Sequence, residues 1–586
     1  MSARPPSRLR RLAVYARRYT WWFVGGAIAL VATNILALKI PGQIGSAVEL
    51  LHTSEGNGST VDLTAIGTIA LTIAGLAIGA ALSRVLSRSF IFAAGRRVEY
   101  DVRNDLFAHL LRLSPADYEK SSTGDLVSRI INDVTQIRLL FGVGALNLVN
   151  TTFAYIIVLG FMFELSPKLT LWALAPYPFV LWIMRWFTRQ LYQRTVSAQE
   201  AVSDVTSQAQ EALSGAAVVQ SFVMENHTSD AFGRASHAYA ERNVAVARIR
   251  GGLMPFMRMV GSLGTLIVIV FGGRAVLDGT LTLGQFVEFS GYVVMLAWPT
   301  MALSWVLSVW SRGTAAFERS CQVLDTEPSV GEPHTAIPLP QHGDICFEDV
   351  SLTYPDGTVA LSDISLRIQA GATVAVVGPT GSGKSSLVEL ITRLRDPSAG
   401  RITYGDVDLR DAALDDVRAR MSYAPQEGFL FSMSLADNIA LGSERDDEAI
   451  ARATKIAHLT GDLSAFSEGL DTWVGERGVT VSGGQRHRST IARAVYADAD
   501  VLLLDDALAS VDTETERAIL GELGGVLKDR TSVLVTHRFN ALDLVDAIYV
   551  LEDGRLIESG THDELTERGG RYAEMVERQQ LEAGLE

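Results

Sequence analysis

The sequence GPTGSGKSS, residues 378–386, decides the class of the fold. It fits the pattern G-x-x-x-x-G-K-S/T through Gly378, Gly383, Lys384 and Ser385. The apolar run before it favours a buried strand, and the residues after it favour a helix. Glycines in this context let successive backbone N–H groups surround a polyphosphate at a helix N-terminus. Lys384 would reach the β- and γ-phosphates and the Ser385 hydroxyl would ligate Mg²⁺, so the stretch predicts a nucleoside triphosphate site.

Composition limits the class of protein further. A chain of 586 residues suggests two to four domains. Hydrophobic residues make up 48% and charged ones 20%, and the mean hydropathy of +0.20 is high for a soluble protein. The net charge of −15 argues against a nucleic-acid binder. The two cysteines are too few for a disulfide framework and lack metal-ligand spacing.

The first half of the chain predicts six transmembrane helices. The predicted spans are 21–38, 63–82, 139–163, 169–187, 259–277 and 286–309. Each is near the length of about 20 residues that crosses a bilayer. The basic residues before the first span place the N-terminus in the cytoplasm, and an even number of spans returns the chain to that side. The arginine-rich connections at 84–138 and 185–258 are predicted to be cytoplasmic, with helical hairpin tips at 114–124 and 214–226.

Polar and sulfur-containing residues also fall within or beside these spans. The polar ones are Asn34, Lys39, Asn147, Asn150, Arg258 and Glu288. Such residues often line a polar pathway, but Lys39 and Glu288 are also compatible with snorkelling to the interface or with a pair between helices, and the sequence leaves these open. The methionines and tryptophans are Met254, Met257, Met259, Met295, Met301, Trp298, Trp305 and Trp310. These are compatible with an adaptable apolar cavity or with ordinary packing.

A change in composition separates the membrane region from a second domain. Residues 325–342 contain four prolines and little periodicity, which is typical of a linker. From residue 343 onward, strand and helix patterns mix with Gly-rich turns, as in a soluble α/β domain. We therefore expect a transmembrane domain at 1–324, a linker at 325–342 and an α/β domain at 343–586.

Further motifs complete the nucleotide chemistry. The apolar strand 501–504 ends in Asp505, which is well placed for Mg²⁺, and the strand 532–536 ends at His537, which is able to bond a γ-phosphate or water. VSGGQ, residues 481–485, begins a helix and makes a second anion-binding surface. One nucleotide needs only one such surface, so the second predicts closure over a nucleotide held by another domain. That is an argument for a dimer.

These motifs together resemble those of exporter-type ATP-binding cassette (ABC) transporters. The resemblance covers nearly the whole chain and implies an all-α transmembrane domain of six long helices fused to an α/β P-loop nucleotide-binding domain. It implies ATP and Mg²⁺ as ligands. It also implies a multi-pass protein of the inner (cytoplasmic) membrane, a hydrophobic or amphipathic cargo and a second ABC half-transporter as partner, with no nucleic acid.

The resemblance also implies roles for single residues. The nucleotide contacts would be Tyr354 on adenine, the Walker A residues Gly378, Pro379, Thr380, Gly381, Ser382, Gly383, Lys384, Ser385 and Ser386, and the signature residues Ser482, Gly483, Gly484 and Gln485. The metal contacts would be Ser385, Gln426 and Asp505, and the catalytic group would be Asp506, His537 and Gln426. The D-loop would be Ala509–Asp512, while Val474–Gly478 and the two hairpin tips would pass motion between the domains.

One position departs from the family pattern. The residue after the Walker B aspartate is usually Glu, which polarises the attacking water, whereas here it is Asp506. Its carboxylate is one methylene shorter, and a displacement of about 1 Å in a catalytic group costs on the order of a hundredfold in rate. This resembles the non-catalytic half of heterodimeric bacterial exporters. A slow homodimeric exporter, an importer on the same fold and an ATP-gated regulator or channel are the alternatives.

Overall fold

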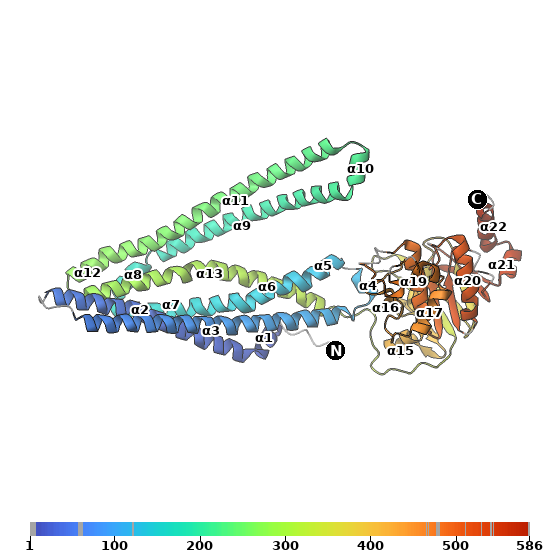
Figure 1. Ribbon diagram of the computed structural model, residues 1–586, viewed down its shortest axis with the longest axis horizontal. Helices are drawn as coiled ribbons and strands as arrows, with labels where there is room; N and C mark the ends of the chain where they lie inside the picture. The colour runs from blue at the N-terminus through green and yellow to red at the C-terminus, as the bar shows by residue number, and fades with distance from the viewer. Residues whose placement is uncertain are drawn as a thin grey trace. The chain divides into compact units, whose positions relative to one another are not determined.

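The computed structural model describes residues 8–56, 62–119, 122–464, 466, 468–475, 481–509, 511–528, 530–538, 542 and 544–583 (Figure 1). Contacts between Cα atoms divide the chain into two compact units. The first comprises Met1–Ala108 and Leu126–Asp325, and the second comprises His109–Asp125 and Thr326–Glu586.

The first unit is helical throughout its described residues. Its helices are α1 (Arg8–Arg18), α2 (Thr20–Gly56), α3 (Leu63–Leu110, which ends in the second unit), α5 (Thr123–Ser128), η1 (Arg129–Asp133), α6 (Val134–Leu139), η2 (Leu140–Gly144), α7 (Ala145–Leu165), α8 (Pro167–Leu174), α9 (Tyr177–Ser214), α10 (Ala216–Ser221), α11 (Glu225–Ile267), η3 (Val268–Gly272), α12 (Gly273–Leu277) and α13 (Leu283–Leu324). A helix pairs its backbone N–H and C=O groups internally, which a lipid environment requires.

Four described helices are long and apolar enough to cross a membrane: Thr20–Glu55, Leu63–Leu110, Thr123–Leu165 and Leu283–Leu324. They contain four of the six predicted spans. The predicted span 169–187 is interrupted between α8 and α9 at Pro176, which lacks a backbone N–H donor. The predicted span 259–277 lies in α11, η3 and α12, where Ser262–Leu277 forms a shorter apolar helix.

Two antiparallel helices, α9 and α11, lie side by side and are joined through the short helix α10 (Figure 1). This places the predicted tip at 214–226 at the end of a helical hairpin, where every described residue of α10 is exposed or half-buried. Elsewhere in the first unit α13 packs against α2 and α7. Leu38, Phe289 and Tyr292 are buried in the resulting core.

The second unit contains two β-sheets. Its strands are β1 (Ile345–Thr353), β2 (Val359–Ile368), β3 (Thr373–Val377), β4 (Ala399–Tyr404), β5 (Val407–Asp408), β6 (Met421–Ala424), β7 (Val501–Asp505), β8 (Thr531–Val535), β9 (Ala547–Glu552) and β10 (Arg555–Gly560). The antiparallel sheet has the order β2-β1-β4-β5, and the other has the order β10-β9-β3-β8-β7-β6. In the second sheet the pairs β9–β3, β3–β8, β8–β7 and β7–β6 are parallel.

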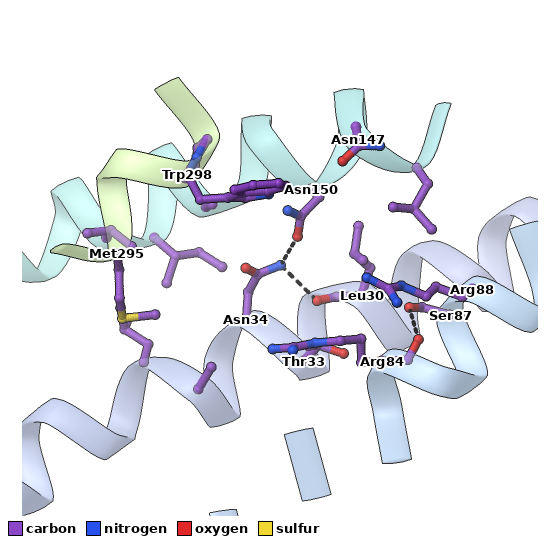
Figure 2. Close-up of a pocket in the computed structure, with 17 residues that line it drawn as sticks. Leu30, Thr33, Asn34, Arg84, Ser87, Arg88, Asn147, Asn150, Met295 and Trp298 are labelled. Atoms are coloured by element: carbon purple, nitrogen blue, oxygen red, sulfur yellow. Dashed lines mark hydrogen bonds between the residues drawn. The ribbon is translucent and has the colours of Figure 1, made fainter. Parts of the chain in front are cut away.

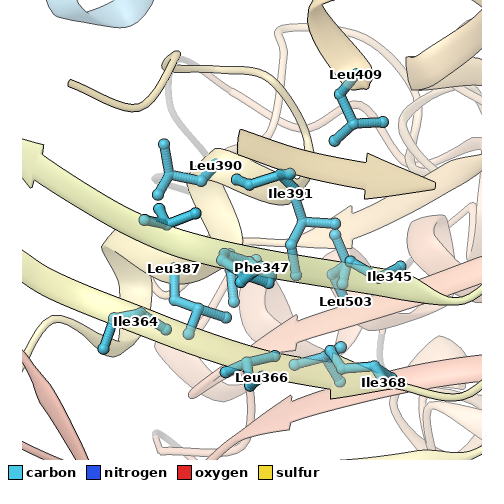
Figure 3. Packing of buried hydrophobic residues seen from close by; sticks show 14 of the residues in the cluster. Ile345, Phe347, Ile364, Leu366, Ile368, Leu387, Leu390, Ile391, Leu409 and Leu503 are labelled. Carbon is cyan, nitrogen blue, oxygen red and sulfur yellow. The ribbon is translucent and has the colours of Figure 1, made fainter. Parts of the chain in front are cut away.

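The second unit also contains helices. They are α4 (Pro115–Tyr118), α14 (Lys384–Ile391), η4 (Leu409–Asp411), α15 (Leu414–Ala419), α16 (Leu435–Ile439), α17 (Asp447–Ile456), α18 (Thr460–Leu463), η5 (Gly469–Asp471), α19 (Gly483–Tyr496), α20 (Thr513–Leu527), α21 (His562–Arg568) and α22 (Arg571–Ala583). Of these, α14, α15, α19 and α21 contact the strands. Between the sheets, Phe347, Leu366, Leu387 and Leu503 belong to one buried cluster (Figure 3). Strands β3, β7 and β8 are buried along their whole length, as is typical of parallel strands covered on both faces.

Residues of the predicted linker pack on the second unit. Leu339 is buried in its core, and its backbone N–H donates to Asp416 at 2.9 Å. The segment 109–125 belongs to the same unit. There the carboxylate of Asp117 accepts hydrogen bonds from the backbone N–H and the hydroxyl of Ser329, at 3.0 and 3.2 Å. The first predicted hairpin tip is therefore tied to the chain that follows the membrane helices.

Candidate nucleotide site

The stretch 378–386 comprises the loop after β3, residues 378–383, and the first three residues of α14. Gly383 caps α14 with φ of 97°, a left-handed conformation that favours glycine. A Cβ atom built at this position would lie 2.5 Å from the backbone oxygen of Ala360. The residue must therefore be Gly for both conformation and space. Backbone N–H groups at the start of α14 have no partner within the helix, which suits them to bind phosphate.

Lys384 is buried beside this loop. Its Nζ donates to the backbone oxygens of Gly378 at 3.0 Å and Pro379 at 2.8 Å. Burial lowers the pKa of Lys384, and the nearby carboxylates Asp506 and Asp505 oppose that shift. The ammonium group thus binds the loop backbone, and the charges of the two carboxylates act on it.

The strand β7 brings Asp505 to the loop. Asp505 is 1% exposed, and its Oδ1 accepts a hydrogen bond from the Ser385 hydroxyl at 3.1 Å. The Tyr423 hydroxyl donates to its Oδ2 at 3.4 Å. Burial raises the pKa of Asp505, although the bonds from Ser385 and Tyr423 act against this.

A hydroxyl and a carboxylate side by side are the hard oxygen ligands that Mg²⁺ prefers. Ser385 and Asp505 therefore fit this ion. No group of three or more Asp, Glu, His or Cys side chains able to hold a metal occurs among the described residues. Such a group is not required here, because Mg²⁺ in phosphate-loop proteins takes one or two protein ligands and completes its shell with phosphate oxygens and water.

Asp506 directly follows Asp505 and has an unusual backbone conformation. Its φ is 45°, and its backbone N–H donates to the Val535 oxygen at 2.9 Å. Asp is among the residues enriched in this left-handed region. The next strand, β8, carries His537 just beyond its end. Desolvation and the charge of Lys384 lower the pKa of His537, which favours the neutral imidazole near pH 7.

Most of the predicted residues line one cavity of about 280 Å³. Those present are Tyr354, Thr380, Gly381, Gly383, Lys384, Ser385, Ser386, Gln426, Asp505, Asp506 and His537. Gly378, Pro379 and Ser382 are not in the lining but form part of the loop beneath Lys384, whose Nζ contacts all three. Sequence reasoning missed Thr358, Val359, Ala360 and Val535, which also line the cavity. Their residue types do not indicate a nucleotide site in the sequence, because they contribute to the cavity only through their position in the fold.

The second anion-binding surface does not line this cavity. Ser482 is the N-cap of α19, where its Oγ accepts from the Gln485 N–H at 3.2 Å and its own N–H donates to Gln485 Oε1 at 2.9 Å. Ser482 and Gly483 are exposed, while Gly484 and Gln485 are half-buried. Gln485 Nε2 also donates to Asp462 at 3.2 Å, which fixes the side chain. In this one chain the loop and the signature residues are therefore separate.

A buried arginine connects the site to the first hairpin tip within the second unit. The Arg395 side chain is 7% exposed and forms ion pairs with Glu389, at 2.6 Å, and with Glu119. Its guanidinium carbon lies 4.7 Å from the ring centroid of Tyr354, and the Tyr354 hydroxyl bonds Ser386 Oγ at 2.9 Å. No sequence pattern singled out Arg395, because Glu119 and Tyr354 are distant from it along the chain.

Two predicted segments are only partly described. Of Val474–Gly478, residues 474 and 475 are described, with Val474 buried. Of Ala509–Asp512, Ser510 lies outside the described residues, and Asp512 caps α20 by accepting from the Thr515 N–H at 2.9 Å.

Family models match both units. One described as "ABC transporter transmembrane region" matches residues 23–300, and one described as "ABC transporter" matches residues 361–509. The chain is 34% identical to the probable multidrug resistance ABC transporter ATP-binding/permease protein YheI of Bacillus subtilis (strain 168), over 98% of each chain. It is 33% identical to an ATP-dependent lipid A-core flippase of Thiobacillus denitrificans, over 86% of this chain and 88% of that protein.

A solved structure agrees with these matches. The structure of a bacterial Atm1-family ABC exporter with ATP bound superposes with a TM-score of 0.80 and 26% identity, over 96% of this chain and 99% of that one. The fold class predicted from the sequence is therefore confirmed, both for the helical membrane domain and for the α/β nucleotide-binding domain.

Proposed function

This chain belongs to the exporter family of ABC transporters, and we propose that it is one half of a heterodimeric exporter of hydrophobic or amphipathic molecules. Membership implies ATPase-coupled transport and a multi-pass protein of the inner membrane. The proposal adds a non-identical partner half, and it adds an orientation with the N-terminus and the nucleotide-binding domain in the cytoplasm. The arginine-rich connections support this orientation.

The separation of the two anion-binding surfaces supports a dimer. The signature residues Ser482 and Gly483 are exposed and do not line the cavity of their own chain. A nucleotide on the stretch 378–386 would be enclosed when a partner's signature helix covers it. ATP then drives the transport cycle only through the difference in its affinity for the closed and open arrangements.

Each residue of the nucleotide site is proposed to have the role that its side-chain chemistry suits. The stretch 378–386 and Lys384 would hold the phosphates, Tyr354 would contact the adenine, and Ser385, Asp505 and Gln426 would hold Mg²⁺. When bound, that ion neutralises charge on the β- and γ-phosphate oxygens. His537, which favours the neutral form, would bond the γ-phosphate or the attacking water, and Asp506 would polarise that water.

Asp506 is the single observation that carries the heterodimer. It lines the nucleotide cavity directly after the buried Asp505, where its shorter side chain would hold the carboxylate back from an attacking water. The signature residues of the chain are complete. A chain with a weak site of its own and a sound signature is suited to complete the stronger site of a partner.

The test compares two exchanges in the complex purified from the native membrane and reconstituted in vesicles. Asp506→Asn removes the charge and keeps the shape, and we expect complex turnover to change less than twofold. Exchange of the partner's corresponding Glu to Gln should lower ATPase by about a hundredfold or more, as expected for loss of a catalytic group.

The homodimer is the second candidate, because the chain carries both a complete loop and a complete signature. In that case the purified complex contains this chain alone, and Asp506→Asn nearly abolishes ATPase. That result would overturn the heterodimer and retain the exporter.

A further inference from the structure

A cavity of about 410 Å³ lies among α2, α3, α7 and α13 in the first unit (Figure 2). It is separate from the nucleotide site and lies beside the predicted membrane spans. The intramembrane residues Asn34, Asn147 and Asn150 line it, as do Met295 and Trp298. Lys39 is not in its lining, and Glu288 lines a different cavity. The side chains of Met254, Met257, Arg258 and Met301 lie outside the described part of the chain.

Two arginines that sequence analysis did not single out also line this cavity. Arg84 and Arg88 are one turn apart on α3, just past the predicted end of the span 63–82. Both are exposed residues at the start of the predicted cytoplasmic connection 84–138. Like charges at this spacing repel each other. An anion between the two side chains would relieve this repulsion.

The protein does not supply such an anion among its described residues. No ion pair to Arg84 or Arg88 is present there, and none of the described residues lining the cavity is acidic. The contrast lies farther along the same helix. There Arg96, Arg103 and Arg138 all pair with the buried Glu99, at 3.2, 2.8 and 3.2 Å. Arginines of the first unit are thus paired with a carboxylate near Glu99, whereas Arg84 and Arg88 have no such pair among the described residues.

The asparagines add further donors. Asn34 Nδ2 donates to Asn150 Oδ1 at 3.0 Å and to the Leu30 oxygen at 2.9 Å. This bond uses one of the two lone pairs of Asn150 Oδ1 and leaves the Nδ2 of Asn150 as a donor. In Figure 2 the pair lies between Arg88 and Trp298. The polar part of the cavity therefore combines two positive charges with amide groups and no described carboxylate, which suits an anionic head.

Apart from Thr33 and Ser87, the rest of the described lining is apolar. Leu30 and Leu38 come from α2, Leu146 and Val158 from α7, and Trp298 from α13. An apolar body would pack against these side chains while a polar head contacts α3. A small inorganic anion would leave this surface unused, and a neutral or cationic amphiphile would leave the arginines uncompensated.

We propose that this cavity binds anionic amphiphiles, molecules with an apolar body and a phosphate, sulfate or carboxylate head, through Arg84, Arg88 and Asn150. Arg84 and Arg88 form charge-assisted bonds to the head, which are the stronger kind of hydrogen bond. That such molecules are the exported class rests on the proposed function; that they bind here does not.

Binding is measured on the full-length chain in phosphatidylcholine nanodiscs, with empty nanodiscs subtracted. The probes are radiolabelled dodecyl phosphate, dodecyltrimethylammonium and dodecyl maltoside, which share one chain length. Loss of charge-assisted bonds costs about tenfold or more in affinity. We expect dodecyl phosphate to bind at least about tenfold more tightly than the other two, and Arg84→Gln with Arg88→Gln to remove that preference.

Two controls make the result specific. Arg84→Lys with Arg88→Lys keeps the charge and should retain most of the preference. Arg185→Gln with Arg189→Gln changes two exposed arginines at the same spacing on α9, outside the cavity lining, and should leave affinity within twofold. ATP binding by each variant reports folding. Equal affinity for all three probes, or an unchanged preference after loss of both arginines, overturns the proposal.

Two further experiments identify the source of the anion and test binding separately from export. Phosphatidylglycerol in the nanodisc displaces dodecyl phosphate if a bilayer lipid is the occupant, and does not if the occupant is a soluble amphiphile. Both results support the anionic class. Preferential binding without ATP-driven flux in vesicles keeps this site and rejects export. Flux of dodecyltrimethylammonium with no preference for the phosphate keeps export and rejects this site.

Discussion

Exchange of Asp506 for Glu tests the central claim about the nucleotide site. The backbone at Asp506 is held by its N–H bond to Val535, at 2.9 Å, and by a φ of 45°. The main chain is therefore constrained, and side-chain length sets the reach of the carboxylate. One more methylene extends that reach by about 1.5 Å, the length of a carbon–carbon bond. A displacement of about 1 Å is worth on the order of a hundredfold in rate, so Asp506→Glu should raise turnover at this site by about 10- to 100-fold.

The same backbone predicts a cost in stability. A left-handed conformation is strained for residues with a Cβ atom, and Asp tolerates it better than longer side chains do. We expect Asp506→Glu to lower the free energy of unfolding by about 0.5–1 kcal/mol. In a domain of this size that corresponds to a loss of about 1–4 °C in Tm. Faster hydrolysis with a slightly lower Tm is therefore the expected combination.

The assay uses the reconstituted complex in which the partner's catalytic Glu is replaced by Gln, so that the residual ATPase reports this chain's site. Asp506→Asn is the matched control and should show no gain. If Asp506→Glu leaves turnover unchanged or lowers it while the complex still binds ATP, side-chain reach does not limit this site. The aspartate would then be present because it suits the backbone, and the argument for a weakened site would fail.

Two further predictions concern stability. Arg395→Met should lower the free energy of unfolding by about 1–3 kcal/mol, less than for a fully buried pair because the Glu389 and Glu119 side chains are 25% and 47% exposed. Thermal melts should show a fall of several degrees in Tm. The control Arg401→Met removes an ion pair whose side chains are 57% and 47% exposed, and it should shift Tm by less than about 1 °C. His487 is buried in α19, and burial lowers its pKa below the ordinary 6.5, so the unfolded chain takes up the proton first and stability is lost as pH falls through about 6.5. The Tm of His487→Gln should therefore fall less than that of the wild type between about pH 7.5 and 5.5. His334→Gln, at an exposed position, should behave as the wild type does. An equal fall in Tm for the wild type and both variants would contradict this explanation.

Much of the nucleotide site could be predicted from the chain because its motifs are local. The left-handed turn at Gly383, the lysine beside it and the following helix all lie within a few residues of one another. Asp505 and His537 could be predicted as well, because each follows an apolar strand and parallel strands end at the same edge of a sheet. The roles assigned to these residues, and the boundaries of the domains, stay predictions.

The contacts of Arg395 and of the cavity arginines could not be predicted in this way. Arg395 pairs with Glu119, which lies 276 positions earlier in the chain. In the sequence, Arg84 and Arg88 belong to a predicted basic cytoplasmic connection. Only the packing of the helices places them in one cavity with Asn150 and Trp298. The same sequence pattern, arginine on a helix, also occurs at Arg96 and Arg103, which pair with Glu99.

The sequence by itself determined the fold class, the phosphate loop and the separate signature helix, because hydrophobic periodicity and glycine-dependent turns act over a few neighbouring residues. The tertiary structure decided which charges are paired, which cavity residues face one another and where the first hairpin tip is anchored. Those properties depend on contacts between residues that are distant along the chain, and a single sequence carries no local signal for them.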